Sequence, residues 1–358
     1  MLPPHGADVT NRSVAVIGAG AWGTALAQLV AGSGRCVRLW CYEPEVAEGI
    51  ATRRENAHFL PGIALASTIT PTTDLGASLL DAEAVLMVVP SHAFRAVFSR
   101  VAPVLPTDVP VVSATKGIEV ESLALMTDIM RELLPAGRSH PLAVLSGPSF
   151  AAEVAKGHPT AVTLACREPN VARALQDVLT SAAFKLFTTP DVIGVQVGGA
   201  LKNVIALAAG GSDGLGFGAN TRAALITRGL AEISRLGVAM GGQPWTFSGL
   251  SGLGDLILTC TDRQSRNFTV GYRIGRGETL DAITRGVSAV AEGVRTVRAA
   301  YALSRKHHVL MPIVEQVHAV LYEGKDPRKA VTDLMEPSVG DELFRSPDRG
   351  AWGDTARG

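Results

Sequence analysis

A glycine-rich turn near the start of the chain restricts the fold more than any other feature. Residues 18–23 read GAGAWG, a GxGxxG pattern, between the apolar run VAVI at 14–17 and the helix-forming segment TALAQLVA at 24–31. Glu43 supplies the acidic residue expected about 20 positions later. A glycine-rich turn that binds no ligand is the alternative, but such a turn would not need a strand before it, a helix after it and an acidic residue at this distance. The pattern therefore predicts a dinucleotide-binding turn after the first strand of a doubly wound sheet.

Each glycine has its own predicted role. Gly18 permits the tight turn, Gly20 lets the backbone approach a pyrophosphate, and Gly23 lets the helix pack closely on the strand. The N–H groups at the start of the helix then bind the phosphates. Glu43 suits a ribose 2′-hydroxyl and so favours NAD, whereas Arg53 and Arg54 could reach the 2′-phosphate of NADP. The sequence leaves the choice between the two cofactors open.

The hydrophobic pattern divides the chain in two. Up to Pro190, short apolar runs alternate with helical patterns, which indicates a parallel sheet with helices on both faces. After that point the strand signal stops. We expect an α/β fold with a Rossmann-type dinucleotide-binding domain at 13–190, a helical substrate and catalytic domain at 191–342, and loose termini at 1–12 and 343–358. The runs predicted as strands are 14–17, 37–40, 85–89, 109–114, 142–145, 161–166 and 184–188, with helices at 22–31 and 123–134 among them.

The second half is predicted to be all helical. Asn220 has the side chain of an N-cap for a helix at 221–236, and Gly237 would end it. Further helices are expected at 293–306 and 313–322, and another begins at the Asp-Pro pair of residue 326.

One helix-length run in this half carries a lysine. Residues 192–210 read VIGVQVGGALKNVIALAAG, and only Gln196, Lys202 and Asn203 are polar. The length fits a membrane span, but a central lysine opposes insertion, and there is no second such run. The lysine could also extend from a half-buried helix to water. If it is buried, it must be paired or lose its proton, and either state suits proton transfer.

Composition excludes several classes of protein. The 358 residues are 47% hydrophobic and 18% charged with no net charge, which supports a large core and no general affinity for nucleic acid. Four cysteines without CxxC pairing read as reduced thiols of a cytoplasmic protein, and the first dozen residues lack the apolar core of a signal peptide. There is no HExxH, and the adjacent pair His307 and His308 points in different directions on a helix, so no metal is expected.

A second polar cluster lies at 249–267, GLSGLGDLILTCTDRQSRN. Asp255 stands between glycines and an apolar run, which makes it the candidate partner of a buried Lys202. Ser265, Arg266 and Asn267 offer a hydroxyl, a guanidinium and an amide for a small phosphate. The alternative is an ordinary helix start, with Ser265 as the cap and Arg266 in solvent.

Loops after the strands bring more polar groups to one edge of the sheet. They are residues 90–92, 115–117 and 146–150, and ligands of doubly wound sheets bind at this edge. Lys116 is therefore placed to meet a phosphate or a hydroxyl, although a loop lysine in solvent is the alternative. Ser149 is expected to donate hydrogen bonds, because no GxSxG surrounds it.

These motifs resemble those of the bacterial-type NAD(P)-dependent glycerol-3-phosphate dehydrogenases. The resemblance runs from about Val14 to about Met335. Two departures are visible: Ala21 stands where many members have serine, and Phe268 stands where many have a basic residue. The motifs that carry the resemblance are GAGAWGTALA at 18–27, VVPSH at 88–92, ATKGIE at 114–119, LSGPSFAAEVAKGHPTAV at 145–162, VQVGGALKNVIALAAG at 195–210, GANTRAALITRGLAE at 218–232, GLGDLILTCTDRQSRN at 252–267 and VAEG at 290–293.

The resemblance implies a Rossmann domain followed by a helical domain, and reversible reduction of dihydroxyacetone phosphate to sn-glycerol 3-phosphate for phospholipid synthesis. It implies that Lys202 is the proton donor and acceptor, with Asp255 beside it. The implied substrate-binding residues are Lys116, Gly147, Ser149, Asn203, Asp255, Ser265, Arg266 and Asn267. The implied cofactor-binding residues are Gly18, Gly20, Ala21, Trp22, Gly23, Tyr42, Lys116, Ala151, Arg266, Val290 and Glu292.

Two other functions compete with this hypothesis. A related dehydrogenase acting on a hydroxy acid would need a carboxylate site in place of the phosphate site. A non-catalytic NAD(P)-binding sensor predicts loss of the proton-handling lysine or its partners, yet Lys202, Asp255 and Arg266 are all present. The expected partner is a small phosphate substrate, without nucleic acid or a membrane span, and a homodimer is the assembly to consider.

Overall fold

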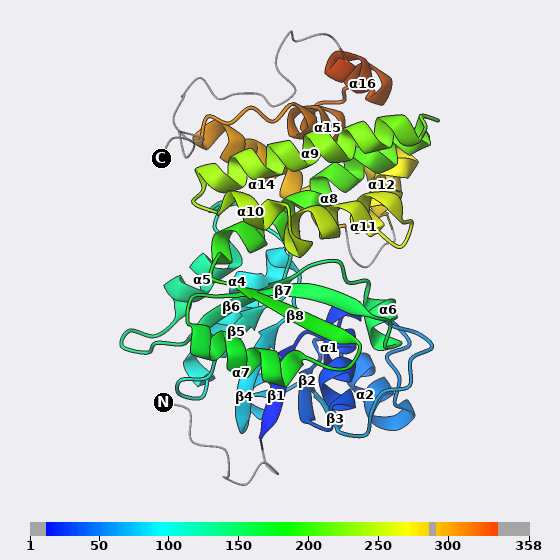
Figure 1. The fold of residues 1–358 in the computed structure, drawn as a ribbon. Coiled ribbons are helices and arrows are strands. Elements are labelled where there is room, and N and C mark those ends of the chain that lie inside the picture. Colours follow the sequence, from blue (N-terminus) through cyan, green and yellow to red (C-terminus); the bar gives the residue numbers. More distant parts are fainter. Residues whose placement is uncertain (1–11, 286–290, 336–358) are drawn as a thin grey trace.

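The computed structural model describes residues 12–285 and 291–335, and its first half is built on an eight-stranded sheet (Figure 1). The strand order is β3-β2-β1-β4-β5-β6-β7-β8, and every pairing is parallel except that of β6 with β7. The strands are β1 (Ser13–Ile17), β2 (Cys36–Trp40), β3 (Ile69–Thr72), β4 (Ala82–Met87), β5 (Val111–Ser113), β6 (Leu142–Ser146), β7 (Thr160–Cys166) and β8 (Phe184–Thr189).

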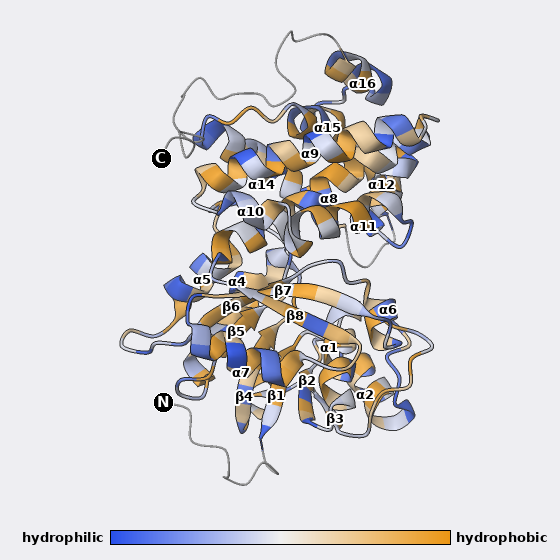
Figure 2. Cartoon of the chain, viewed as in Figure 1, coloured by the Kyte–Doolittle hydropathy of each residue, from blue (hydrophilic) through white to orange (hydrophobic). Residues whose placement is uncertain are grey.

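Helices cover both faces of this sheet. One core cluster packs α1 and α7 on one face, and a second packs α3, α4 and α5 on the other. Strands buried on both sides read as continuous apolar runs, which is why the α/β fold could be predicted. Figure 2 shows hydrophilic residues along α7, on the outer side of the sheet. The helices are α1 (Ala21–Gly32), α2 (Pro44–Arg53), α3 (Leu75–Ser78), α4 (Ser91–Val101), α5 (Met126–Leu133), α6 (Ala151–Ala155) and α7 (Pro169–Leu179).

The structure departs from the sequence-based expectation in three places in this half. Strand β3 was not predicted, because its ITPT sequence has one apolar residue and a proline that only an edge strand tolerates. The predicted sheet was parallel, but β7 runs antiparallel to β6. Helix α5 begins at Met126 and not at Leu123, whose φ of 61° is left-handed.

The second half is a helical domain arranged around α8 (Val192–Gly214). Helices α9, α11, α12 and α14 all pack against α8. A helix enclosed by other helices is apolar all round, which explains its sequence. The surrounding elements are α9 (Ala219–Ala239), α10 (Pro244–Phe247), α11 (Asp255–Thr261), α12 (Arg266–Gly275), α13 (Leu280–Thr284), α14 (Glu292–Lys306), α15 (Pro312–Tyr322) and α16 (Pro327–Met335).

Helix α8 is long and apolar enough to cross a membrane by length and composition alone. Its most apolar stretch is 89% buried inside the protein, however, as expected for the central helix of a folded domain. Lys202 is 7% exposed, so it does not extend to water. The buried alternative for this lysine is therefore the one observed.

Two predicted boundaries of α9 were wrong. The N-cap is Gly218 and not Asn220, and the helix continues past Gly237 to Ala239. Gly237 lies inside the helix. A side chain at this position would overlap the ring of Phe247, because a Cβ on Gly237 would lie only 2.1 Å from that ring. Its role is close packing of α10 on α9, and not termination.

Candidate active site

The turn between β1 and α1 forms one side of the candidate site. Gly18 has a φ of 116°, and a Cβ there would lie 2.7 Å from the carbonyl oxygen of Val88. A Cβ on Gly23 would lie 1.8 Å from the carbonyl oxygen of Gly18, so the helix packs directly on the turn. A Cβ on Gly20 would meet nothing within 4 Å. Gly18 and Gly23 thus have the predicted roles in the tight turn and in close packing, and the space beside Gly20 is open.

Asn56 fixes this turn from outside, and sequence reasoning missed it. Its Nδ2 donates to the carbonyl oxygen of Ala19 and to Oγ1 of Thr24, both at 2.8 Å. The side chain is 1% exposed. It belongs to the segment after α2, more than 30 residues beyond the glycines, and no local pattern marks it.

The residues around the turn fit a nicotinamide dinucleotide. The first N–H groups of α1 lack partners within the helix and can bind phosphate. Nε1 of Trp22 is buried without a hydrogen-bond partner among the described residues, so it has a donor to offer. Ala21, Trp22 and Ala151 pack on the same core cluster, which brings the start of α6 beside the start of α1.

The side chains considered for cofactor preference have different surroundings. Tyr42 is 73% exposed, and Glu43 is the N-cap of α2. Arg54 donates to the carbonyl oxygens of Leu65, Ala66 and Ile69, so its guanidinium is used within the fold. Arg53 is exposed. Of the two arginines, Arg53 is therefore the one available to a 2′-phosphate.

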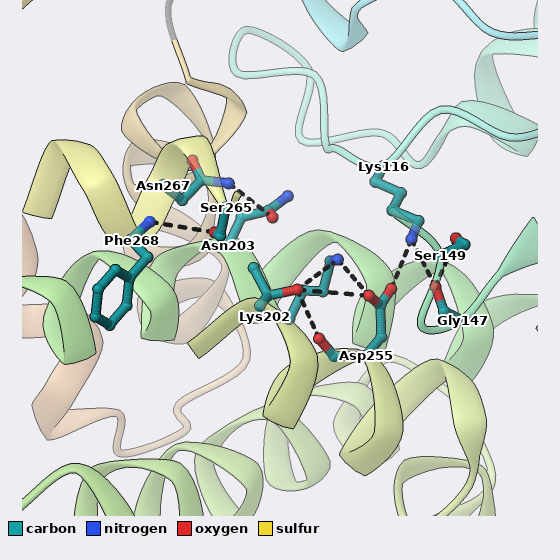
Figure 3. Close-up of polar contacts among 10 residues, drawn as sticks. Lys116, Gly147, Ser149, Lys202, Asn203, Asp255, Ser265, Asn267 and Phe268 are labelled. Carbon is teal, nitrogen blue, oxygen red and sulfur yellow. Dashed lines mark hydrogen bonds and ion pairs between the residues drawn. The ribbon is translucent and has the colours of Figure 1, made fainter. Parts of the chain in front are cut away.

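A cluster of charges forms the other side of the site, with Lys202 and Asp255 buried and Lys116 half-buried (Figure 3). Nζ of Lys202 donates to Oδ1 of Asp255 at 2.5 Å, and Nζ of Lys116 donates to Oδ2 of the same carboxylate at 2.6 Å. Lys116 also donates to the carbonyl oxygen of Gly147 at 3.0 Å. The pairing of Lys202 with Asp255 expected from the sequence is thus observed, and Lys116 joins it.

Thr259 is a fourth member of this cluster that the sequence analysis did not single out. Its Oγ1 accepts from Nζ of Lys202 at 2.8 Å and donates to the carbonyl oxygen of Asp255 at 2.6 Å. Asp255 begins α11, directly after the π-helical turn Leu250–Gly254, and Thr259 lies one turn further along the same face. That spacing of four residues was the available signal.

Burial lowers the pKa of Lys202 to about 8. Loss of solvation is the largest cause, and the positive charge of Lys116 acts in the same direction. The carboxylate of Asp255 opposes both but does not cancel them. Burial therefore outweighs pairing, which the sequence could not decide, and the amine can change protonation state near neutral pH.

The two lysines each keep a donor for a ligand. An ammonium has three N–H groups, and the described structure accounts for two on Lys202 and two on Lys116. Ser149 lies beside them, with its hydroxyl donating to the carbonyl oxygen of Gly147 at 2.9 Å. Gly147 itself adopts a φ of 150°, where a Cβ would lie 2.8 Å from Cα of Val162.

The start of α12 brings Ser265 and Asn267 to the same site, and Arg266 lies between them in sequence (Figure 3). Ser265 caps the helix by accepting from the backbone N–H of Phe268. Arg266 is exposed, and no other described residue forms a hydrogen bond or ion pair with its guanidinium. Asn267 donates to Oδ1 of Asn203 at 2.9 Å (Figure 3). The segment is thus a capped helix start, and its guanidinium is also available for an anion.

Glu292 connects the start of α14 to the sheet. Its carboxylate accepts from the backbone N–H of Ser91 at 3.1 Å and from the Ser91 hydroxyl at 2.5 Å. Ser91 begins α4, and residues 88–90 separate it from the end of β4 at Met87. Val290, the other predicted cofactor contact in this segment, lies outside the described residues. No group of three or more histidine, cysteine, aspartate or glutamate side chains in the described ranges could hold a metal ion.

Sequence comparison identifies relatives along almost the whole chain. Residues 13–172 match the N-terminal region of NAD-dependent glycerol-3-phosphate dehydrogenase, and residues 191–332 match its C-terminal region. Glycerol-3-phosphate dehydrogenase [NAD(P)+] of Citrifermentans bemidjiense is 54% identical over 324 residues, which are 90% of this chain and 97% of that protein. The protein of the same name from Syntrophobacter fumaroxidans is 51% identical over 330 residues, 92% of this chain and 97% of that protein.

A solved structure agrees with these relatives. The crystal structure of glycerol-3-phosphate dehydrogenase from Coxiella burnetii is similar with a TM-score of 0.87 at 40% sequence identity. The match covers 91% of this chain and 99% of that one.

Proposed function

The chain belongs to the NAD-dependent glycerol-3-phosphate dehydrogenase family, and we propose that it interconverts dihydroxyacetone phosphate and sn-glycerol 3-phosphate with NAD(H) or NADP(H). The observation that carries this proposal for the chain's own residues is the buried Lys202, held by Asp255 and Thr259. A proton donor and a phosphate-binding group are what this substrate requires. The product would supply phospholipid synthesis.

Lys202 is the proposed general acid in the direction of reduction. A nicotinamide cofactor held by the glycine turn would supply the hydride for C2 of the substrate. Nζ of Lys202 gives a proton to the C2 oxygen as negative charge develops there, and it takes that proton back in the direction of oxidation. Asp255 and Thr259 hold the amine in place through the two bonds described above, which leaves one N–H for the substrate.

The neighbouring residues position the substrate. Arg266 binds the phosphate, because a guanidinium pairs with phosphate oxygens through two parallel hydrogen bonds. Lys116, with its remaining N–H, and Asn203 bind the hydroxyl and carbonyl end. Ser149, Gly147 and Ser265 complete the wall of this site. Such positioning contributes several kcal/mol to lowering the barrier.

The glycine turn is the proposed cofactor site. The backbone at Gly18, Gly20 and Ala21 and the indole N–H of Trp22 would hold the pyrophosphate, and Gly23 keeps the helix start close. Tyr42 would contact the adenosine end. Further contacts are proposed for Lys116, Ala151, Arg266, Val290 and Glu292.

Several wider features of the protein are proposals as well. We place the division between the dinucleotide-binding domain and the helical catalytic domain at 190/191, with the second ending near 342. The four cysteines are all free thiols, which supports a cytoplasmic location. The expected partner is the small phosphate substrate, and a homodimer is the proposed assembly.

Steady-state reduction of dihydroxyacetone phosphate tests the function directly. Oxidation of NADH and of NADPH is followed by loss of absorbance, with pyruvate as a control for hydroxy-acid dehydrogenase activity. We expect turnover with dihydroxyacetone phosphate, and the ratio of the two kcat/KM values gives the cofactor preference. Turnover of the keto acid alone would overturn the proposal.

A further inference from the structure

The peptide between Ala19 and Gly20, inside the glycine turn, is held by two side chains. Nδ2 of Asn56 donates to the carbonyl oxygen of Ala19 at 2.8 Å, and Oγ1 of Thr24 donates to the same oxygen at 3.2 Å. The second N–H of the Asn56 amide goes to Oγ1 of Thr24 at 2.8 Å. Both N–H groups of this amide are therefore used, and Asn56 has no donor left for a ligand of its own.

The segment after α2 determines which way the Asn56 amide faces. The backbone N–H of Phe59 donates to Oδ1 of Asn56 at 3.1 Å. Because a backbone N–H can only donate, the atom that faces Phe59 must be the oxygen, and the nitrogen must face Ala19. The same segment is tied to α1, where Oε1 of Gln28 accepts from the backbone N–H of Ala66 at 2.9 Å. The amide is thus held in one orientation against the turn.

The carbonyl group of Ala19 fixes the direction of the Gly20 N–H. The chain has no cis peptide bond, and in a trans peptide the C=O and the N–H point in opposite directions. The oxygen of Ala19 points to Asn56, so the N–H of Gly20 points away from Asn56. This N–H has no partner among the described residues, and a Cβ on Gly20 would meet nothing within 4 Å. A free donor is therefore directed to the side of the turn that the protein leaves open.

Without these contacts the peptide between Ala19 and Gly20 could flip. A flip changes φ of Gly20 from its present value of −64°, and glycine adopts positive φ without a steric penalty. The flipped peptide would direct the carbonyl oxygen of Ala19 to the open side in place of the N–H. An anion bound there would then meet a partial negative charge where it needs a donor.

We propose that Asn56, supported by Thr24, is a positioning residue for the cofactor, which fixes the Gly20 N–H as a hydrogen-bond donor to the pyrophosphate. The proposal rests on the glycine turn as the cofactor site of the function given above. It deepens that function, because it assigns part of the affinity for the pyrophosphate to a side chain that does not contact it. Asn56 therefore contributes to cofactor binding and not to proton transfer at Lys202.

Equilibrium binding to the full chain tests this role. Reduced cofactor is titrated by its fluorescence with the unaltered protein and with Asn56→Leu, which keeps a branched side chain but loses the amide. The Kd should rise about 10- to 100-fold, the effect expected for loss of one hydrogen bond to a charged group. In steady-state assays the KM for the cofactor should rise as well, while kcat at saturating cofactor changes less than about twofold, because Lys202 is untouched.

Two further variants separate positioning of the turn from folding of the segment. Thr24→Val removes only the second donor to the Ala19 oxygen and should raise the Kd about threefold, so it decides the matter if Asn56→Leu fails to fold. Glu55→Ala is the matched control. Oε1 of Glu55 accepts from the backbone N–H of Gly62 at 2.8 Å in the same segment and forms no hydrogen bond with the described residues of the turn, so the Kd should stay unchanged.

Three results would overturn the proposal: an unchanged Kd in folded Asn56→Leu, an unchanged Kd in Thr24→Val, or an equal rise in Glu55→Ala. Failure of the proposed function would look different. The unaltered protein would then reduce dihydroxyacetone phosphate with neither cofactor. Failure of this inference alone would leave cofactor binding and turnover of the unaltered protein intact.

Discussion

The glycine turn before α1 and the lysine–aspartate cluster of α8 and α11 form the two sides of the candidate site. The turn uses backbone groups, whereas the cluster uses side chains. The turn offers backbone N–H groups and leaves space beside Gly20. The cluster offers side chains that are almost fully enclosed, with Asp255 only 1% exposed. A phosphate needs donors at fixed positions, which backbone supplies without a titrating group. Proton transfer needs a group whose pKa lies near the working pH, and burial produces that shift.

This difference also decides which substitutions each side tolerates. In the turn, a side chain at Gly23 would overlap the backbone of Gly18, whereas a side chain at Gly20 would enter open space. In the cluster, two lysines share one carboxylate, so loss of Asp255 would leave the buried Lys202 and the half-buried Lys116 without a counter-charge. Breaking a buried ion pair in this way typically costs about 3–5 kcal/mol.

Replacement of Lys202 should have the largest effect on catalysis. Lys202→Met fills a similar space and leaves Asp255 paired with Lys116, so the variant should fold. Because the proton donor is lost, kcat should fall by about 10²–10⁴ while the dissociation constant of the cofactor stays unchanged. Lys185→Met, at an exposed position of β8, is the matched control for loss of one lysine. Near-normal turnover of the Lys202 variant would remove the cluster from the mechanism.

Replacement of Arg266 should weaken substrate binding more than cofactor binding. Arg266→Ala removes the guanidinium that has no partner among the described residues, so the KM for dihydroxyacetone phosphate should rise about 10- to 100-fold. The KM for the cofactor should rise by a smaller factor, because Arg266 is also a proposed cofactor contact. Arg263→Ala removes an exposed guanidinium three residues earlier and should change neither constant. An unchanged substrate KM in Arg266→Ala would contradict the phosphate contact.

A pair of alanine substitutions separates binding from folding on the other side. Gly20→Ala should leave thermal stability intact, because the added methyl group meets no protein atom, yet raise the cofactor dissociation constant about tenfold by blocking the pyrophosphate. Gly23→Ala forces the methyl group against the Gly18 carbonyl and should destabilise the fold by about 1–3 kcal/mol. Thermal melting and cofactor titration of both variants provide the check. Equal effects of the two on stability would show that the turn lacks this division of roles.

The same comparison explains what could be predicted from the sequence. The glycine turn consists of six consecutive residues, and its strand and helix flank it directly in the sequence. Both the fold class and the turn could therefore be predicted. The pairing of Lys202 with Asp255 could be proposed because each charge interrupts an apolar run. Thr259 could have been found from its spacing of four residues from Asp255 on one helix. Lys116 as a third member of that cluster and Asn56 behind the turn depend on segments that only the folded chain brings together. The antiparallel pairing of β7 likewise has no signature within its own seven residues.

The smallest and most specific effect is expected from Lys116, through the pKa of its neighbour. The kcat/KM for reduction requires protonated Lys202 and should fall as pH rises through about 8, whereas oxidation requires the neutral amine and should rise over the same range. Because the charge of Lys116 lowers the pKa of Lys202, Lys116→Met should move both transitions to higher pH. Lys116→Arg keeps the charge and should leave them in place, even if the substrate KM changes in both variants. A pH profile identical in the methionine variant and the unaltered protein would mean that the two lysines share Asp255 without sensing each other, and that burial alone sets the pKa of the catalytic amine.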